Sequence, residues 1–294
     1  MDVLVIGGTG FIGSWIVKQL VARGDNVTVL HGGRKSPEEL PQGAISIISE
    51  GSLASSHTYE AALGSGEPDA VIHVFALFER DAKEAVSALS GRAGRIVVLS
   101  SGDVYRAYGR FTRLEPGPPD PTPLKVDTSP LRRRLYPYRT ASDIPGTLRH
   151  DYDKIPVENI FRAAQSLPSV ILRLPKVYGS EGNADLATIY NFAAYPAWRW
   201  THGYVENVAA AAVLAAHHPR SPGRTYNIGE AVTPTVGERL AQLPPRPEPP
   251  RKNTVYDFGQ SMDYDTEPVR TELGFIEPVT YDEGLRRTLA GQQA

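Results

Sequence analysis

Apolar residues in the first half of the chain alternate between two periods. Short runs rich in valine, isoleucine and leucine are typical of buried strands, and they occur at residues 3–6, 27–30, 45–48, 70–76, 96–99 and 170–174. Between these runs apolar side chains recur at helical spacing, first at Ile12, Trp15, Ile16 and Leu20 and later within residues 79–90, 154–165 and 205–217. This alternation predicts an α/β fold with a doubly wound parallel sheet.

Prolines interrupt the alternation between residues 115 and 145. Proline lacks the backbone N–H that helices and central strands need, so this stretch is expected to be a stiff surface excursion. The 294 residues suffice for one large domain and a small lobe. We therefore expect a dinucleotide-binding domain at 1–175, which includes the excursion, and a small, reduced substrate lobe at 176–294, interleaved with the last elements of the sheet.

Composition excludes several classes of function. The chain has no cysteine, which removes disulfides, thiolate nucleophiles and cysteine-type zinc sites, and no metal site is predicted. A net charge of −2 gives no field that attracts a nucleic acid. The first apolar run begins at Val3 without a basic segment before it, so neither a secretory signal nor a membrane span is expected, and a cytoplasmic protein is the default.

The strongest motif is a glycine-rich run between the first predicted strand and the first predicted helix. It reads Gly7-Gly8-Thr9-Gly10-Phe11-Ile12-Gly13. Gly7 permits a tight turn, Gly10 lets the backbone approach a diphosphate, and Gly13 lets the helix pack closely on the sheet. The free N–H groups and positive dipole at the start of the helix would then bind the phosphates.

This run resembles the extended short-chain dehydrogenase/reductases, also called the NAD-dependent epimerase/dehydratase family. Segments 99–105, 172–179, 204–209 and 272–275 are similar to further motifs of that family, in the expected order. The resemblance implies a Rossmann fold, a nicotinamide cofactor and a small-molecule substrate. It also implies a possible homodimer, because dimers are common among relatives.

Cofactor choice is read at the end of the second strand, where an acidic residue would favour NAD. His31 stands there, and Arg34 and Lys35 follow, so NADP is favoured over NAD. Where the family usually has an aspartate for the adenine, this chain has Ser52. The resemblance implies further cofactor contacts at Leu53, Phe75, Ala76, Ser100, Lys154, Pro175 and Val177.

The catalytic residues depart from the family pattern. In the family a tyrosine precedes a lysine by four residues on one helix, and the lysine lowers the pKa of the phenol. The lysine here corresponds to Lys154, but His150 occupies the tyrosine position. Tyr152 lies two residues before the lysine, which on a helix is the opposite face. Pro156 is also unfavourable inside a helix.

Two interpretations remain open for the acid/base. Either the helix starts late, with Pro156 in its first turn, so that Tyr152 reaches the site from a non-helical segment, or His150 does the work. Ser101 matches the family's catalytic hydroxyl. Asp103 lies where dehydratases carry an acid, although a turn-stabilising role is equally consistent with its position.

The predicted function is that of an NAD(P)-dependent oxidoreductase or epimerase acting on a carbinol or keto carbon of a small or sugar-like substrate. Alternatives are a redox-neutral dehydratase, cyclase or isomerase, and a catalytically degenerate dinucleotide-binding regulator. Tyr105 is a candidate substrate contact, and so are Trp198, Arg199, Trp200 and His202, four side chains that core packing of the small lobe would explain equally well.

Overall fold

A sheet of seven parallel strands forms the centre of the molecule. The computed structural model describes residues 1–33, 40–49, 55–64, 66–133, 152–246 and 256–291. The strand order is β3-β2-β1-β4-β5-β6-β9, which confirms the predicted α/β class with a parallel, doubly wound sheet. Its strands are β1 (Asp2–Ile6), β2 (Asn26–His31), β3 (Ile45–Ile48), β4 (Ala70–His73), β5 (Ile96–Ser101), β6 (Ser169–Leu174) and β9 (Thr225–Asn227).

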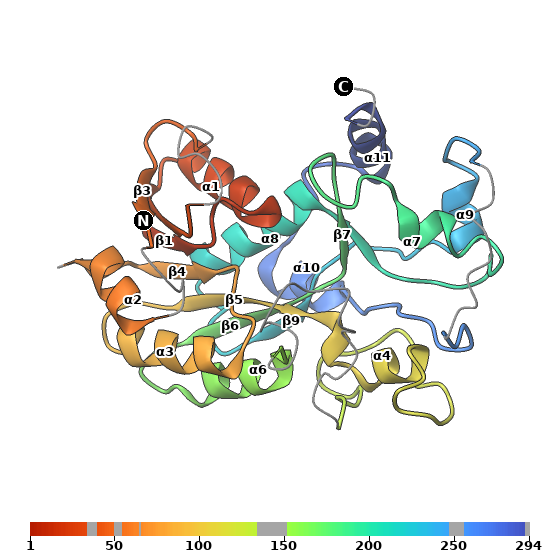
Figure 1. Cartoon of the computed structure of the whole chain (residues 1–294), viewed down its shortest axis with the longest axis horizontal. Helices are drawn as coiled ribbons and strands as arrows, with labels where there is room; N and C mark the ends of the chain where they lie inside the picture. The colour runs from red at the N-terminus through yellow and green to blue at the C-terminus, as the bar shows by residue number, and fades with distance from the viewer. Residues whose placement is uncertain (34–39, 50–54, 65, 134–151, 247–255, 292–294) are drawn as a thin grey trace.

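Helices cover both faces of this sheet (Figure 1). On one face α1 (Phe11–Arg23), α8 (Val205–His217) and α10 (Glu267–Leu273) pack against one set of strand side chains, such as Val3 and Val5. On the other face α2 (Ser56–Leu63), α3 (Glu79–Leu89) and α6 (Lys154–Ala163) pack against the alternate set, such as Leu4 and Ile6. Successive strand residues point to opposite faces, so both faces need apolar side chains.

A smaller lobe lies beyond the carboxyl ends of the strands. It contains η2 (Gly102–Val104), α4 (Arg106–Phe111), a two-stranded sheet of β7 (Lys176–Tyr178) and β8 (His202–Tyr204), and the helices α7 (Ala187–Tyr190), α9 (Val236–Leu240) and α11 (Tyr281–Ala290). Phe111, Leu124, Trp198 and Tyr264 belong to its aromatic core. The lobe therefore takes residues from both sides of position 175.

Two local expectations need correction. The proline-rich stretch has no helix or strand over its described residues 115–133, but it is not only a surface excursion. Leu124 is fully buried, and its N–H donates to the carbonyl of Asp263, because the small lobe needs this segment to complete its core. Strand β4 ends at His73 rather than at residue 76, since Val74 and Phe75 form a turn beside Gly7.

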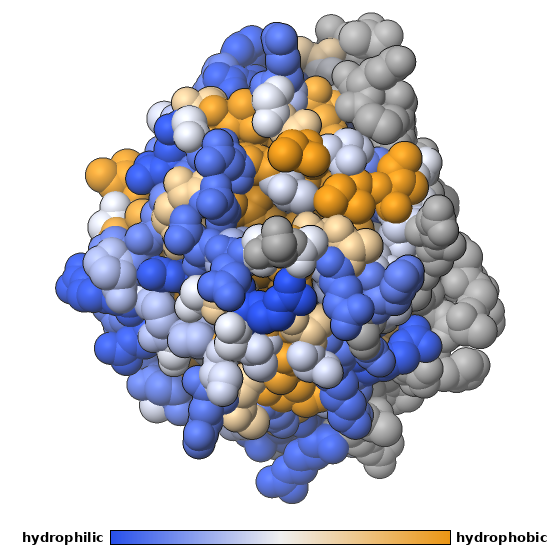
Figure 2. Space-filling view, turned by 90° about the vertical axis from the view of Figure 1, so that its left-hand side faces the viewer, coloured by the Kyte–Doolittle hydropathy of each residue, from blue (hydrophilic) through white to orange (hydrophobic). Residues whose placement is uncertain are grey.

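The β3 edge of the sheet carries exposed apolar residues. Ile45 and Ile48 are 63% and 52% exposed. Figure 2 views the molecule from this side and shows hydrophobic surface gathered in its upper half. Within the described residues, no helix combines the length and the apolar character needed to cross a bilayer.

Candidate functional site

The glycine-rich run forms a tight turn between β1 and α1. Gly7 adopts a φ of +87°, which a residue with a side chain rarely adopts. A Cβ on Gly8 would lie 2.6 Å from Val29 Cγ1, and one on Gly13 would collide with the carbonyl oxygen of Gly7. These three glycines are therefore required by the protein's own backbone and packing.

Gly10 differs from the other glycines of the turn. Its φ of −77° is open to any residue, and a Cβ there would meet nothing closer than the Gly7 oxygen at 3.5 Å. Gly10 is exposed, and no side chain caps α1. The N–H groups of Phe11, Ile12 and Gly13 have no acceptor within the helix, because the first turn of a helix lacks them. The turn thus fits a diphosphate that approaches the backbone closely.

The carboxyl ends of β1, β4, β5 and β6 lie along one edge of the sheet because these strands are parallel. Phe75 and Ala76 follow β4, and the Cβ of Phe75 would lie 3.3 Å from one placed on Gly7. Phe75 is 37% exposed at this position. Pro175 and Val177 follow β6, where Val177 is buried and Pro175 partly so.

Helix α6 starts late. Its N-cap is Asp153, whose carboxylate accepts from the N–H of Ile155, so Lys154 is the first helical residue. Pro156 then lies in the first turn, where a missing N–H costs no helical hydrogen bond. Tyr152 precedes the helix and forms a bridge with Phe78. The helix therefore starts late, as one of the two interpretations requires, whereas His150, the acid/base of the other, lies outside the described residues.

Lys154 and Tyr152 converge on the ends of β4 and β5. The Lys154 amine donates to the carbonyl of Leu99 at 2.9 Å and to that of Ala76. It lies 6.0 Å from the centre of the Tyr152 ring. The phenol of Tyr152 donates to Asp103 Oδ2 at 3.0 Å, and both side chains are buried. The edge of the sheet therefore brings together an ammonium, a phenol and a carboxylate.

The two serines at the end of β5 have different environments. Ser101 is partly exposed, and its hydroxyl accepts from the N–H of Asp103 at 3.3 Å, capping η2. The turn-stabilising group is therefore Ser101, while the Asp103 carboxylate faces Tyr152. Ser100 is buried and donates to Glu158 at 2.6 Å. In this structure Ser100 is not placed to contact a cofactor, which corrects its predicted role.

A buried charge cluster behind the site was missed in the sequence. Glu158 is fully buried and accepts from Arg173 at 2.8 Å, from Arg162 at 2.6 Å and from Ser100. Burial alone would raise the pKa of Glu158, but the charges of the two arginines and the hydrogen bonds outweigh burial and lower it. The signal was an arginine, Arg173, within an otherwise apolar strand.

His31 is buried at the end of β2. Its ring nitrogens contact Ser46 Oγ at 2.8 Å and the N–H of Gly33 at 3.3 Å. Burial lowers its pKa, which favours a neutral ring. β2 carries the His31 side chain into the sheet, and its contact with a cofactor stays a prediction. Arg34, Lys35, Ser52, Leu53 and His150 lie outside the described residues.

Most predicted substrate residues belong to the core of the lobe. Tyr105 is fully buried, and its hydroxyl donates to Asn227 at 2.7 Å. Trp198 is buried and stacks on Phe111 with ring centroids 4.9 Å apart. His202 is buried, which lowers its pKa well below the usual value. All three side chains are packed inside the lobe, as the core-packing alternative predicts for Trp198 and His202, and their contact with a substrate stays a prediction.

The other two predicted substrate residues keep some exposure. Arg199 donates to the carbonyl of Thr233 and lies 4.0 Å from Glu238. Trp200 packs at the edge of the aromatic core, and its ring lies 5.7 Å from that of Trp198. The structure thus keeps these two at the surface of the lobe rather than inside it.

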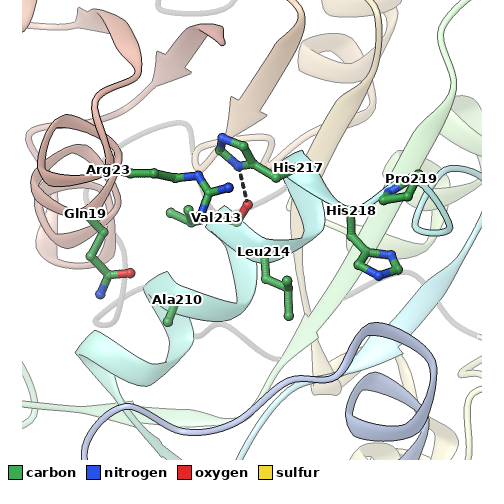
Figure 3. A pocket seen from close by; sticks show the side chains of 8 residues that line it. All are labelled: Gln19, Arg23, Ala210, Val213, Leu214, His217, His218 and Pro219. Atoms are coloured by element: carbon green, nitrogen blue, oxygen red, sulfur yellow. Dashed lines mark hydrogen bonds between the residues drawn. The ribbon is translucent and has the colours of Figure 1, made fainter.

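A pocket of about 410 Å³ lies away from this site, between α1 and α8. Figure 3 shows Gln19 and Arg23 on α1 facing Val213, Leu214 and His217 on α8. None of the predicted site residues lines it. Over the described parts of the chain, no group of three acidic, histidine or cysteine side chains is arranged to hold a metal ion.

The parallel sheet, the glycine turn and the polar side chains at the strand ends are the features of a Rossmann-type α/β fold. Residues 3–91 match the family model of the NAD dependent epimerase/dehydratase family. This match confirms the resemblance over the segment from β1 to α3, which is similar to the model of this family.

Solved structures extend the likeness to the whole chain. UDP-glucose 4-epimerase from Thermotoga maritima, in complex with UDP-glucose, shares 22% identity over 100% of this chain and 99% of its own, with a TM-score of 0.70. The Thermus thermophilus UDP-glucose 4-epimerase in complex with NAD shares 22% identity over 100% of this chain and 99% of its own, with a TM-score of 0.68. Bordetella bronchiseptica WbmG in complex with NAD and UDP shares 21% identity over 100% of this chain and 95% of its own, with a TM-score of 0.68. These similarities establish that the chain shares the Rossmann-like α/β fold of these structures. No curated protein sequence matches the chain.

Proposed function

We propose that this chain is a nicotinamide-dependent oxidoreductase or epimerase that acts on a carbinol or keto carbon of a small or sugar-like molecule. The observation that carries the proposal is Gly10, the glycine that neither packing nor backbone conformation requires. A ligand that approaches the backbone explains its presence, and the family match over 3–91 supports a dinucleotide as that ligand.

The roles of the residues follow from their positions. The N–H groups of Phe11, Ile12 and Gly13 would hold the diphosphate, and Thr9, Phe75 and Ala76 would lie alongside. The nicotinamide, when bound, supplies the hydride chemistry. Ser101 would donate a hydrogen bond to the substrate oxygen, and Tyr152 would exchange a proton with that oxygen. Lys154 would hold the ends of β4 and β5 in place next to Tyr152. Loss of a positioned acid/base costs on the order of 10²–10⁴ in rate, so Tyr152→Phe should abolish most turnover.

The choice between NADP and NAD belongs to the proposal. With His31 buried, a preference for NADP depends on Arg34 and Lys35, whereas the similar Thermus thermophilus and Bordetella bronchiseptica structures are in complex with NAD. The affinities for NADPH and for NADH, measured separately in the wild type and in an Arg34→Ala variant, test this preference. Only a weaker affinity of Arg34→Ala for NADPH supports NADP. A homodimer and a cytoplasmic location remain predictions.

A second candidate is redox-neutral dehydration or isomerisation in the same site, with Asp103 and Tyr152 as base and acid. The contact between these two side chains favours it. Turnover of a hydroxy-carbonyl substrate without any added or bound dinucleotide would support this candidate over the first.

Fluorescence titration of the purified protein with NADPH and NADH tests the main proposal. The wild type should bind at least one of them, and Gly10→Ala should weaken that binding tenfold or more while keeping the melting temperature, because its Cβ disturbs only the ligand's space. Lys18→Ala, on the exposed side of α1, is the matched control and should bind like the wild type. Absence of binding by the wild type, or an unaffected Gly10→Ala, contradicts the proposal.

A further inference from the structure

The hydrogen bond between Tyr152 and Asp103 has a defined direction. A carboxylate at neutral pH only accepts, so the phenol donates its proton to Asp103 Oδ2 across 3.0 Å. Tyr152 is 4% exposed and Asp103 is 6% exposed, so bulk water hardly competes for this bond. A phenol that donates its one proton also carries oxygen lone pairs, and these are the atoms that would accept a hydrogen bond from a carbinol.

Both members of the pair are fixed in place. The Asp103 N–H donates to the Ser101 hydroxyl, and the Asp103 carbonyl accepts from Arg132 Nε. Arg132 is buried and also contacts Asp153 at 3.2 Å. Asp153 is the N-cap of α6 and directly follows Tyr152 in the chain. One arginine thus connects the backbone at Asp103 with the segment that carries Tyr152. The contact is part of the fold rather than a chance approach of two surface groups.

The Lys154 ammonium acts mainly elsewhere. It donates to the carbonyls of Leu99 and Ala76, at the ends of β5 and β4, and it lies 6.0 Å from the Tyr152 ring centre. A carboxylate in contact with a phenol favours the neutral phenol, whereas a nearby ammonium favours the phenolate. The nearer charged group therefore opposes formation of a resting tyrosinate.

We infer that Asp103 is the terminal proton acceptor of a relay through Tyr152, and that the site binds the carbinol form of its substrate through the phenol oxygen. The inference rests on the proposed function. The carbinol O–H bond breaks and its proton goes to Tyr152 Oη, while the phenol's own proton goes to Asp103 Oδ2. The electron pair left on the carbinol oxygen forms the C=O bond as hydride leaves the carbon for the oxidised nicotinamide. Tyr152 is neutral before and after the step, and Asp103 ends protonated.

The relay is distinguishable from a tyrosinate base by which group titrates. Asp103 acts through Tyr152 and is therefore a positioning residue with a pH-dependent role. In the oxidation direction an ionised Asp103 is needed, so the rate should fall on the acid side with a carboxylate-like limb. A tyrosinate base would instead give a limb set by the phenol.

Asp103→Asn is the decisive variant, because an amide oxygen can still accept the phenol's hydrogen bond but cannot take its proton. The full chain is prepared with ring-labelled tyrosine and titrated by NMR, and the Tyr152 signal is assigned by its loss in Tyr152→Phe. The Tyr152 phenol should ionise at a lower pH in Asp103→Asn than in the wild type. In kinetics with the nicotinamide and a carbinol substrate, Asp103→Asn should lower kcat 10²–10⁴-fold with little change in KM and abolish the acid limb. Asp103→Glu should restore that limb in part.

Two outcomes overturn the relay. One is a Tyr152 titration that is the same in Asp103→Asn as in the wild type. The other is a titration that moves in His150→Ala and not in Asp103→Asn, which would assign the partner role to His150. The NMR readout needs no cofactor, so it separates failure of the relay from failure of the proposed function, which the binding titration measures.

Discussion

The two ends of the candidate site are built in different ways. At the glycine turn the shape is set by backbone: Gly8 and Gly13 leave no room for a Cβ, and Gly7 has a positive φ. At the proton-transfer end the shape is set by buried polar side chains, with Lys154 bonded to two strand carbonyls and Tyr152 bonded to Asp103. At the first end Gly7, Gly8 and Gly13 tolerate almost no other residue type, whereas the second end depends on charge and on where one helix begins.

This difference has a practical meaning for substitutions. A change at the turn acts through steric overlap, so the size of the new side chain decides its effect. A change at the other end acts through an uncompensated charge or a lost hydrogen bond, so its effect depends on pH and on the partner left behind. The same site should therefore respond to two different kinds of perturbation.

Removing the charge of Glu158 should have the largest effect on stability. Glu158→Gln leaves Arg173, whose side chain is 2% exposed, without its counter-charge, and breaking such a buried pair costs about 3–5 kcal/mol. Urea unfolding measures this loss. Glu79→Gln, from an exposed pair with Lys83, is the control and should change the free energy of unfolding by less than about 0.5 kcal/mol. Equal effects of the two variants would refute the idea that the buried charges behind the proton-transfer end stabilise the fold more than an exposed ion pair does.

Adding one methyl group at Gly13 should come next. The new Cβ collides with the Gly7 carbonyl and lies 2.8 Å from Gly8 Cα, so backbone must shift at a cost of about 1–3 kcal/mol. Gly10→Ala adds the same atoms three residues earlier, where space is open, and should unfold like the wild type. The paired melting temperatures report whether steric overlap, rather than loss of glycine as such, governs the turn.

Acid should weaken the fold through His73. Burial, and then the positive charge of Lys154, lower the pKa of His73 to about 3. Below about pH 6.5 the unfolded chain therefore binds a proton at His73 that the folded chain does not bind. The free energy of unfolding then falls as pH falls from about 6.5 toward 3, by up to about 1.4 kcal/mol per pH unit. His73→Phe should flatten this slope of unfolding free energy against pH. An unchanged slope in that variant would show that other groups cause it.

The smallest effect is expected for Pro156→Ala. In the first turn the proline loses no hydrogen bond, and its replacement mainly frees the unfolded chain, at a cost of about 0.4–1 kcal/mol. The Tyr152 NMR signal should keep its titration, since Asp153 still caps the helix. A large loss of stability would mean that Pro156 has a packing role that the helix position does not explain.

The glycine turn and the sheet could be predicted because their signals are local. The turn needs glycine at fixed offsets, and strands that are buried on both faces need continuous apolar residues. Residues 3–6 and 96–99 can therefore be predicted as strands from their composition alone. The contacts of Tyr105 and Trp198 could not be predicted in the same way. Their partners Asn227 and Phe111 lie 122 and 87 positions away, and an aromatic in a core has the same local pattern as one that binds a ligand.

The arrangement around Tyr152 shows an intermediate case. Sequence spacing excluded a helical Tyr152 beside Lys154 and left a late helix start as one alternative. Only the position of the Asp153 cap distinguishes it, because an N-cap is recognised by backbone conformation and not by residue type alone. The pairing of Tyr152 with Asp103 then depends on η2, which brings an element 49 residues away to the same place.

The late start of α6 also limits how the protein could be re-engineered. Replacing His150 by tyrosine would not place a tyrosine and a lysine on one helix, because Lys154 is the first helical residue. Pro156 also lacks the N–H that would bond the carbonyl of Tyr152 if the helix began earlier. At least two substitutions, one of them at the proline, would have to occur together. Neither change alone would place a tyrosine and Lys154 four residues apart on one helix.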